Sequence, residues 1–147
     1  MFLRELNKNE SISFLQLVNE VANIDEVFAK EEKNLIEDYK KELGLVNFEI
    51  KRTSYEEIMN ELKKSTYRNK LIIYFELVGL ALIDGKYQEK EVDFLEKIAF
   101  DLGIPRSKKI AIANYFFTFT EVYNFSVVDA ESKIDLLKEQ AEIILSK

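Results

Sequence analysis

The sequence contains no histidine, no cysteine and no tryptophan, and it has only one proline and four glycines. Without cysteine the chain can form no disulfide, thiolate nucleophile, zinc–thiolate site or iron–sulfur cluster. Without histidine it has no imidazole to act as a base near neutral pH or to bind a metal. Any metal site must therefore use oxygen ligands, which favour calcium, magnesium or manganese over zinc or copper.

Basic residues are also in deficit, because 21 Lys and Arg stand against 27 Asp and Glu, for a net charge of -6. A protein that binds nucleic acid nonspecifically needs a cationic surface to displace counterions from phosphate. We therefore expect no nucleic-acid partner. The acidity is local: residues 20–42 hold eight acids and four bases, and residues 84–101 hold six acids and three bases.

Long apolar runs are missing as well. The first residues contain no apolar run of signal-peptide length. The most apolar stretch runs only from position 71 to position 83, and it includes Glu76 and Gly79. A membrane-spanning helix needs about 20 apolar residues, so this shorter stretch predicts a buried helix. We expect a cytoplasmic protein with no transmembrane segment.

What is abundant favours helix. The chain has 147 residues, 47% of them hydrophobic, and is rich in Glu, Lys, Leu and Ile. This composition predicts an all-α fold, in a single domain that spans residues 1–147. About seven helices are expected, at residues 10–23, 29–43, 54–64, 66–83, 88–102, 106–123 and 129–146.

Several local signals place helix ends. Gly44 and Gly103 each follow a Leu and are suited to the left-handed cap that ends a helix. Pro105 is suited to the first turn of the next helix, and residues 54–57 (Ser-Tyr-Glu-Glu) match a capping box. Gly79 stands inside an expected helix, where Gly costs up to about 1 kcal/mol relative to Ala. We therefore expect another helix to pass close to Gly79.

The chain also contains an internal repeat, with quasi-equivalent halves at about 10–45 and 69–104 that align without a gap. Each half reads as an apolar helix, an acidic elbow, and an amphipathic helix that ends in Leu-Gly. Seven positions are identical when residues 22–44 are aligned with residues 81–103. The identical pairs are Ala22/Ala81, Ile24/Ile83, Asp25/Asp84, Glu32/Glu91, Glu37/Glu96, Leu43/Leu102 and Gly44/Gly103.

The second elbow carries a resemblance to a known family. An apolar helix ends in Ala81-Leu-Ile-Asp-Gly85, Tyr87 follows, and Glu91 opens a helix that ends in Leu102-Gly-Ile104. This pattern resembles the TerB-like tellurite-resistance family. The first elbow departs from the pattern, because Glu26 stands where the family has Gly.

The resemblance implies a small all-helical fold, a cytoplasmic stress-response role, and acidic residues at the elbows that bind metal. Carried over position by position, these residues are Asp25, Glu32, Asp84 and Glu91. We expect a non-enzymatic protein that binds a divalent cation (calcium, magnesium or manganese), a protein partner, or both through its elbows. Opposed carboxylates would repel each other without the cation, and a bound cation would tie the two halves together.

A purely structural interpretation of the elbows stays open. Asp84 and Gly85 are a common turn pair. Glu91 would be the third residue of a helix capped by Gln88, where a carboxylate stabilises the first turn by about 0.3–1 kcal/mol. Neither elbow is a calcium EF-hand: in the second, for example, Lys86, Gln88 and Leu95 occupy ligand positions and do not match the motif.

The aromatic segment 115–125 allows two interpretations. Alternating Phe and Thr at 117–120 is typical of a strand, but a lone strand has no partner, so we predict a helix. Its aromatic rings belong either to the core or to a groove that docks a partner. The groove supports an alternative function, a metal-independent protein–protein interaction module. A carboxylate-based hydrolase is a third hypothesis, which no sequence motif supports.

Overall fold

The structure, a computed structural model, describes residues 2–24, 30–82, 89–122 and 138–146. These residues form helices and no strand, so the expected all-α class is confirmed. The described end of the chain is helical at residues 138–145. The other elements are η1 (Leu3–Glu5), α1 (Lys8–Ile24), α2 (Lys30–Glu42), α3 (Tyr55–Leu62), α4 (Tyr67–Leu82), α5 (Glu89–Leu102) and α6 (Arg106–Val122).

The helices expected from the sequence agree with these elements to within two residues at each described end. The last expected helix, 129–146, is helical from 138 to 145, and its earlier part lies outside the described residues. Residues 115–122 belong to α6, so the helical interpretation of the aromatic segment is confirmed for them. The short helix η1 was not expected, because three residues are too few to produce a periodic pattern.

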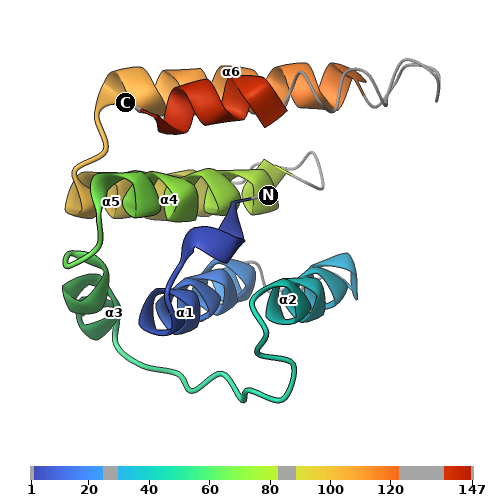
Figure 1. Cartoon of the computed structure of the whole chain (residues 1–147), viewed down its shortest axis with the longest axis vertical. Coiled ribbons are helices and arrows are strands. Elements are labelled where there is room, and N and C mark those ends of the chain that lie inside the picture. The colour runs from blue at the N-terminus through green and yellow to red at the C-terminus, as the bar shows by residue number, and fades with distance from the viewer. Residues whose placement is uncertain (1, 25–29, 83–88, 123–137, 147) are drawn as a thin grey trace.

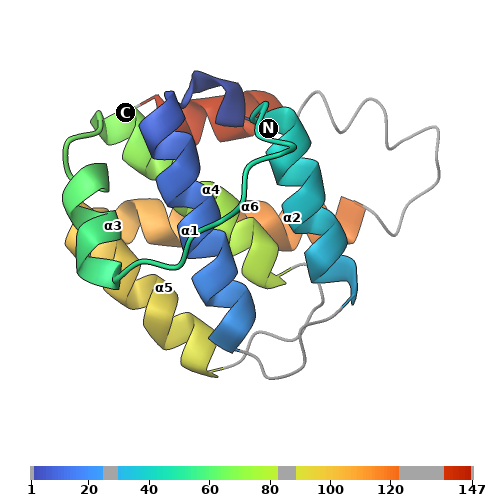
Figure 2. The same ribbon diagram turned by 90° about the horizontal axis from the view of Figure 1, so that it is seen from below.

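The helices lie in three layers (Figure 1). Helix α6 and the segment 138–145 form the upper layer, α4 and α5 the middle layer, and α1, α2 and α3 the lower layer. Turned by 90°, the molecule shows α1 crossing in front of α4 (Figure 2). Residues 43–54 run beneath the lower layer and join α2 to α3 (Figure 1). The middle layer is therefore covered on both faces.

Helix α4 contributes heavily to the hydrophobic core, as the apolar stretch of the sequence predicted. Leu71, Ile72, Ile73 and Leu77 are all fully buried. Burying one such side chain stabilises the fold by about 1.5–3 kcal/mol, so much of the core energy comes from this helix. In the parts of the chain that the structure describes, no helix is both long and apolar enough to cross a membrane.

Two helices end in the glycine caps that the sequence predicted. Gly44 ends α2 with φ 71°, and Gly103 ends α5 with φ 72°. The Gly44 amide donates to the Lys41 carbonyl at 3.2 Å, and the Leu45 amide donates to the Lys40 carbonyl at 2.8 Å. The Gly103 and Ile104 amides make bonds of the same lengths to the Phe100 and Ala99 carbonyls. Both ends are Schellman motifs, which satisfy carbonyls of the last helical turn.

The start of α3 agrees with the predicted capping signal. Ser54 is the N-cap, and its hydroxyl accepts a hydrogen bond from the Glu57 amide at 3.2 Å. The Glu57 carboxylate accepts a hydrogen bond from the Thr53 hydroxyl. The Glu57 carboxylate thus binds the residue before the N-cap, and the Glu57 amide binds the N-cap itself. Both hydrogen bonds stabilise the first turn of α3.

Gly79 lies at the close helix approach that its position predicted. A Cβ atom on Gly79 would come within 2.9 Å of two ring carbons of Phe116 on α6. The Phe116 ring also lies 4.8 Å from the Phe75 ring and 5.1 Å from the Tyr115 ring, measured between centroids. Gly at position 79 therefore makes room for an aromatic cluster between the middle and upper layers.

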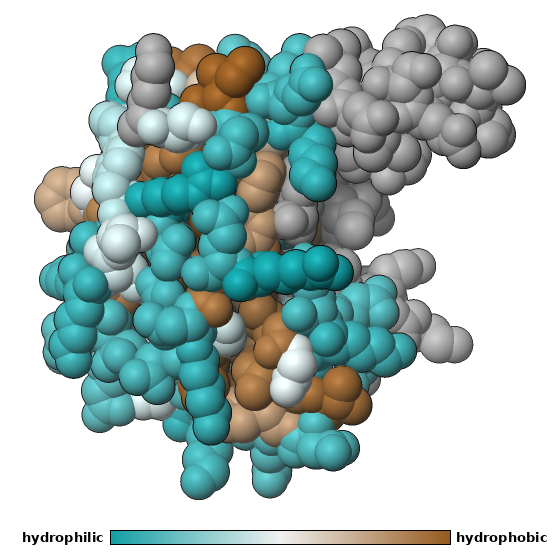
Figure 3. All heavy atoms as spheres, viewed as in Figure 1, coloured by the Kyte–Doolittle hydropathy of each residue, from teal (hydrophilic) through white to brown (hydrophobic). Residues whose placement is uncertain are grey.

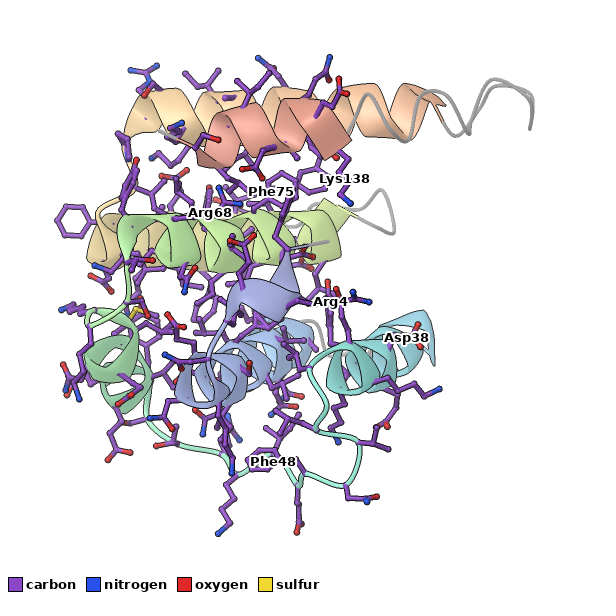
Figure 4. The ribbon with its side chains drawn as sticks, viewed as in Figure 1. Arg4, Asp38, Phe48, Arg68, Phe75 and Lys138 are labelled. Atoms are coloured by element: carbon purple, nitrogen blue, oxygen red, sulfur yellow. The ribbon has the colours of Figure 1, made fainter. Side chains whose placement is uncertain are left out.

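Most of the surface in the view of Figure 3 is hydrophilic, and part of its apolar surface lies in the lower half, where α1, α2 and residues 43–54 meet. Val46 in that segment is 52% exposed, and Phe48 is half-buried against the core. Figure 4 shows Phe48 on the segment below α1. These residues close the lower face of the core.

Candidate functional site

The structure does not describe all four of the residues that were predicted to bind metal. Asp25 and Asp84 lie outside the described residues. Glu32 lies on α2, in a part of the helix whose side chains are not described. Glu91 is described, and it is the third residue of α5, as its expected position in a first helical turn requires. The structure therefore locates one of the four side chains.

Glu91 is buried, with only 5% of its surface exposed. A carboxylate in the first turn interacts favourably with the positive end of the helix dipole, and a buried carboxylate needs partners to offset its desolvation. A buried carboxylate in the first helical turn fits both interpretations of Glu91, as part of a helix cap and as a metal ligand. Among the described residues, no three acidic side chains gather in a way that could hold a metal ion.

The helix ends that border the two elbows lie on one side of the molecule. In Figure 2, α1 and α4 end, and α2 and α5 begin, in the lower half of the view. The end of α1 and the first turn of α5 also share a pocket of about 440 Å³, which Ile24 and Lys90 both line. Ile24, the last residue of α1, is thus close to Lys90 in the first turn of α5.

That pocket has both apolar and charged lining residues. Ile24 and Phe94 are the apolar ones, and Lys90, Asp93 and Lys97 are the charged ones. The Lys97 ammonium lies 4.3 Å from the centre of the Tyr55 ring, a cation–π contact between α5 and the start of α3. The pocket is therefore suited to an amphiphilic group, and its two ammonium groups stand beside an otherwise acidic region.

Tyr55 and Asp101 form a polar contact beside this pocket. The Tyr55 hydroxyl donates to the Asp101 carboxylate at 2.5 Å. Burial, together with this hydrogen bond and the negative charge of Asp101, raises the pKa of the Tyr55 hydroxyl above its usual value. The bond joins α3 to the last turn of α5, so it has a structural role.

A second polar cluster, which the sequence analysis missed, joins the starts of α1 and α4. The Asn7 side chain accepts from the Glu10 amide at 2.8 Å, and the Glu10 carboxylate accepts from the Asn7 amide at 2.9 Å. This is a complete capping box, with Asn as the cap. The Asn69 side-chain amide donates to both Glu10 oxygens at 3.1 and 3.2 Å. The spacing Asn-x-x-Glu was the available signal.

Arg68 is the centre of a third cluster that the sequence did not reveal. Its guanidinium forms paired hydrogen bonds with the carboxylates of Glu5 and Glu142, at 2.7–3.0 Å. The bonds from Arg68 hold the pKa of both carboxyls below the usual value. Figure 4 shows Arg68 between α4 and the C-terminal helical segment. Because its partners are 63 and 74 residues away, no local pattern could have identified this cluster.

Glu76 lies on α4, in the middle layer. Burial, with a smaller contribution from the Glu42 charge, raises the pKa of its carboxyl. Tyr39 on α2 is buried, and desolvation and the charge of Glu76 raise the pKa of its hydroxyl. Perturbed carboxyls are candidates for acid–base chemistry, but Glu76 does not line the pockets at Ser13, Ile24 or Asn114.

Comparisons with known proteins identify no relative. No family model matches the chain, and neither the characterised proteins nor the solved structures provide a match. The function must therefore be inferred from the chain itself.

Proposed function

We propose that this chain is a non-enzymatic, cytoplasmic stress-response protein of the TerB-like type that binds a divalent cation through its two acidic elbows. Asp25, Glu32, Asp84 and Glu91 would supply the oxygen ligands. The observation that supports the proposal best is that the helix ends bordering both elbows lie on one side of the molecule (Figure 2). Carboxylates from both halves could therefore reach one ion.

The proposal includes a structural repeat, in which residues 10–45 and 69–104 are copies of one unit. The alignment that pairs Ala22 with Ala81 also pairs the first residue of α1 with that of α4, and the first residue of α2 with that of α5. It pairs the glycine caps that end α2 and α5 as well, and these caps make equivalent hydrogen bonds. These coincidences of the helix bounds support the proposed repeat in addition to the sequence identities.

The starts of α1 and α4 support the same repeat. Asn7 accepts from the amide of Glu10, and Thr66, which the alignment pairs with Asn7, accepts from the amide of Asn69 at 3.1 Å. Glu10 and Asn69 occupy equivalent positions and also contact each other. Equivalent positions meet where a two-fold axis relates two copies. Two carboxylates there would repel, whereas Glu with Asn forms hydrogen bonds, so the two copies must differ at this position.

A two-fold relation would place the elbows at equal distances from the axis. The net charge of -6 is concentrated in the elbows and the helices that follow them. A hard divalent cation bound by carboxylates from both elbows would neutralise part of this charge and join the two halves. Oxygen ligands of this kind suit calcium, magnesium or manganese.

Thermal unfolding with and without each cation tests the proposal. A site that is filled at a hundred times its Kd stabilises the folded state by about 2.7 kcal/mol. For a chain of this size, the expected rise in Tm is roughly 5–10 °C. The double variant Asp25→Asn/Asp84→Asn should lose this rise.

The matched control is Glu37→Gln/Glu96→Gln. The repeat also pairs these two carboxylates, and replacing both with Gln changes the net charge by the same amount as the metal-site variant does. Their side chains, however, are 58% and 55% exposed and form ion pairs with Lys40 and Lys109. The control should keep the full metal-dependent rise. A Tm that is insensitive to millimolar calcium, magnesium and manganese would refute the metal function.

The alternative is a metal-independent protein–protein interaction module that uses a groove around residues 115–125. Tyr115 is 5% exposed, and Phe116 packs against Gly79, so these two rings belong to the core. The alternative therefore depends on the aromatic residues after position 116, whose side chains are not described. It predicts a protein that captures its partner equally well in excess EDTA and in calcium.

A further inference from the structure

The C-terminal helical segment, residues 138–145, has only a small buried contact with the rest of the fold. It lies beside α6 in the upper layer (Figure 1). Ala141 and Leu145 are fully buried, whereas Ile143 is 67% exposed and residues 138–140 are exposed. Only one face of the segment is therefore packed against the fold.

That surface, called here the seat, consists of Arg68 on α4 and Lys108, Ala111, Asn114 and Tyr115 on α6. The three last residues line a pocket of about 250 Å³ that faces the C-terminal segment. The seat is cationic at two points, although the whole chain is acidic. It is thus complementary to a helix that has a small apolar face and a carboxylate.

Both cationic groups of the seat bind the C-terminal segment. The Arg68 Nη1 and Nη2 atoms donate to the Glu142 carboxylate at 3.0 and 2.9 Å. The Lys108 ammonium donates to the Ile144 carbonyl, which lies in the last helical turn. A cation at the C-terminal end of a helix is favourable because it interacts with the helix dipole.

Arg68 would stay in place without the C-terminal segment. Its Nε and Nη2 atoms also bind the Glu5 carboxylate, at 2.7 and 2.9 Å. The guanidinium lies 5.8 Å from the centre of the Phe2 ring as well. Contacts with Phe2 and Glu5, at the two ends of η1, therefore hold the guanidinium, and release of Glu142 would leave a positioned fork for another carboxylate.

We propose that residues 138–145 form a releasable strap, and that the seat can bind in its place an amphipathic helix from another protein. The partner helix would carry a small residue, a carboxylate at the next position, and a leucine four residues after the small one. Ala141, Glu142 and Leu145 provide this pattern within the chain. Ala141 and Leu145 are both buried, so the small residue and the leucine would form the buried face of the partner helix.

A labelled peptide of residues 134–147, added to the full chain, tests the proposal. The strap competes with the peptide at an effective concentration in the millimolar range, so the wild type should bind micromolar peptide poorly. Glu142→Lys in the full chain places a positive charge against Arg68 and should release the strap. We expect this variant to bind the peptide at least ten times more tightly than the wild type does.

Two controls make the result specific. Glu139→Lys changes the charge of the same helix at an exposed position, and this full-chain variant should behave like the wild type. A peptide that carries Glu142→Lys should not bind any of the chains. Glu142→Gln in the full chain is a milder second variant in case charge reversal unfolds the protein, and it should give an intermediate affinity.

Hydrogen exchange on the unmodified protein provides an independent measurement. The amides of residues 138–145 should exchange faster than those of α4, because the strap opens without global unfolding. Equal exchange rates in the strap and in α4 would overturn the proposal. Failure of the peptide to bind a folded Glu142→Lys chain would overturn it as well.

Discussion

Gly79→Ala should change the sign of its effect on stability according to the residue at position 116. In the wild type the new methyl group would lie 2.9 Å from the Phe116 ring, which is itself packed against Phe75 and Tyr115. Overpacking of this kind costs roughly 1–3 kcal/mol. Ala is favoured over Gly inside a helix by about 1 kcal/mol. The net result is a loss of roughly 0–2 kcal/mol in the free energy of unfolding.

In a Phe116→Ala background the same substitution should stabilise the protein. The ring is gone, so only the helix preference remains, and Gly79→Ala should raise the free energy of unfolding by up to about 1 kcal/mol. The coupling between the two positions is then roughly 1–3 kcal/mol, within the range for residues in direct contact. For a chain of this length it corresponds to a difference in Tm of a few degrees.

Urea unfolding followed by circular dichroism in the far ultraviolet measures this cycle, since the chain is helical and has no tryptophan to report by fluorescence. Phe100→Ala supplies the matched control background, because Phe100 is 84% exposed. Gly79→Ala should have the same effect in this background as in the wild type. An identical effect in the Phe116→Ala background as well would show that Gly79 and Phe116 are not in contact.

Three further sets of substitutions test other parts of the structure. Gly44→Ala and Gly103→Ala should each lower the free energy of unfolding in urea by about 1–2 kcal/mol, because both residues have positive φ and open space around them. The two losses should be similar, and a loss at only one position would contradict the equivalence of the caps. Tyr55→Phe should lower the free energy of unfolding by roughly 1–3 kcal/mol, since it removes a hydrogen bond to the Asp101 carboxylate. An ultraviolet pH titration of this variant should show one fewer tyrosine that ionises above the usual pKa. No change in either measurement would refute the bond. Glu10→Ala should lower the free energy of unfolding, measured by thermal unfolding, by about 1–3 kcal/mol, because it breaks the capping box and leaves the Asn69 amide without its acceptor. A loss below about 0.5 kcal/mol would show that this buried carboxylate is not structurally important.

Local features of the fold could be predicted because their causes lie within a few residues. Gly44 and Gly103 end their helices because only the left-handed conformation allows the Schellman bonds, and Gly adopts it without strain. Ser54 caps α3 through an amide three residues away. The Asn7–Glu10 box is equally local, but the first helix was expected to begin at residue 10, so Asn7 was not expected as its cap.

The candidate site was predictable only in part. The repeat identified Asp25, Glu32, Asp84 and Glu91 as equivalent acidic positions, and the structure describes the side chain of one of them, Glu91, which is buried. The sequence spacing does not determine whether the two elbows approach each other. That depends on how α1 and α4 cross, and this is decided by the packing of the core.

The sequence by itself determined the class of the fold, the helix bounds and the kind of metal chemistry that is possible, because these follow from local backbone preferences and from which side chains are present. The tertiary structure alone decided that Arg68 binds both Glu5 and Glu142, that Glu10 meets Asn69, and that a C-terminal strap rests on α6. These contacts join positions that are far apart in the chain, from 59 for Glu10 and Asn69 to 74 for Arg68 and Glu142. They form only when hydrophobic burial brings the helices together, so no local pattern records them.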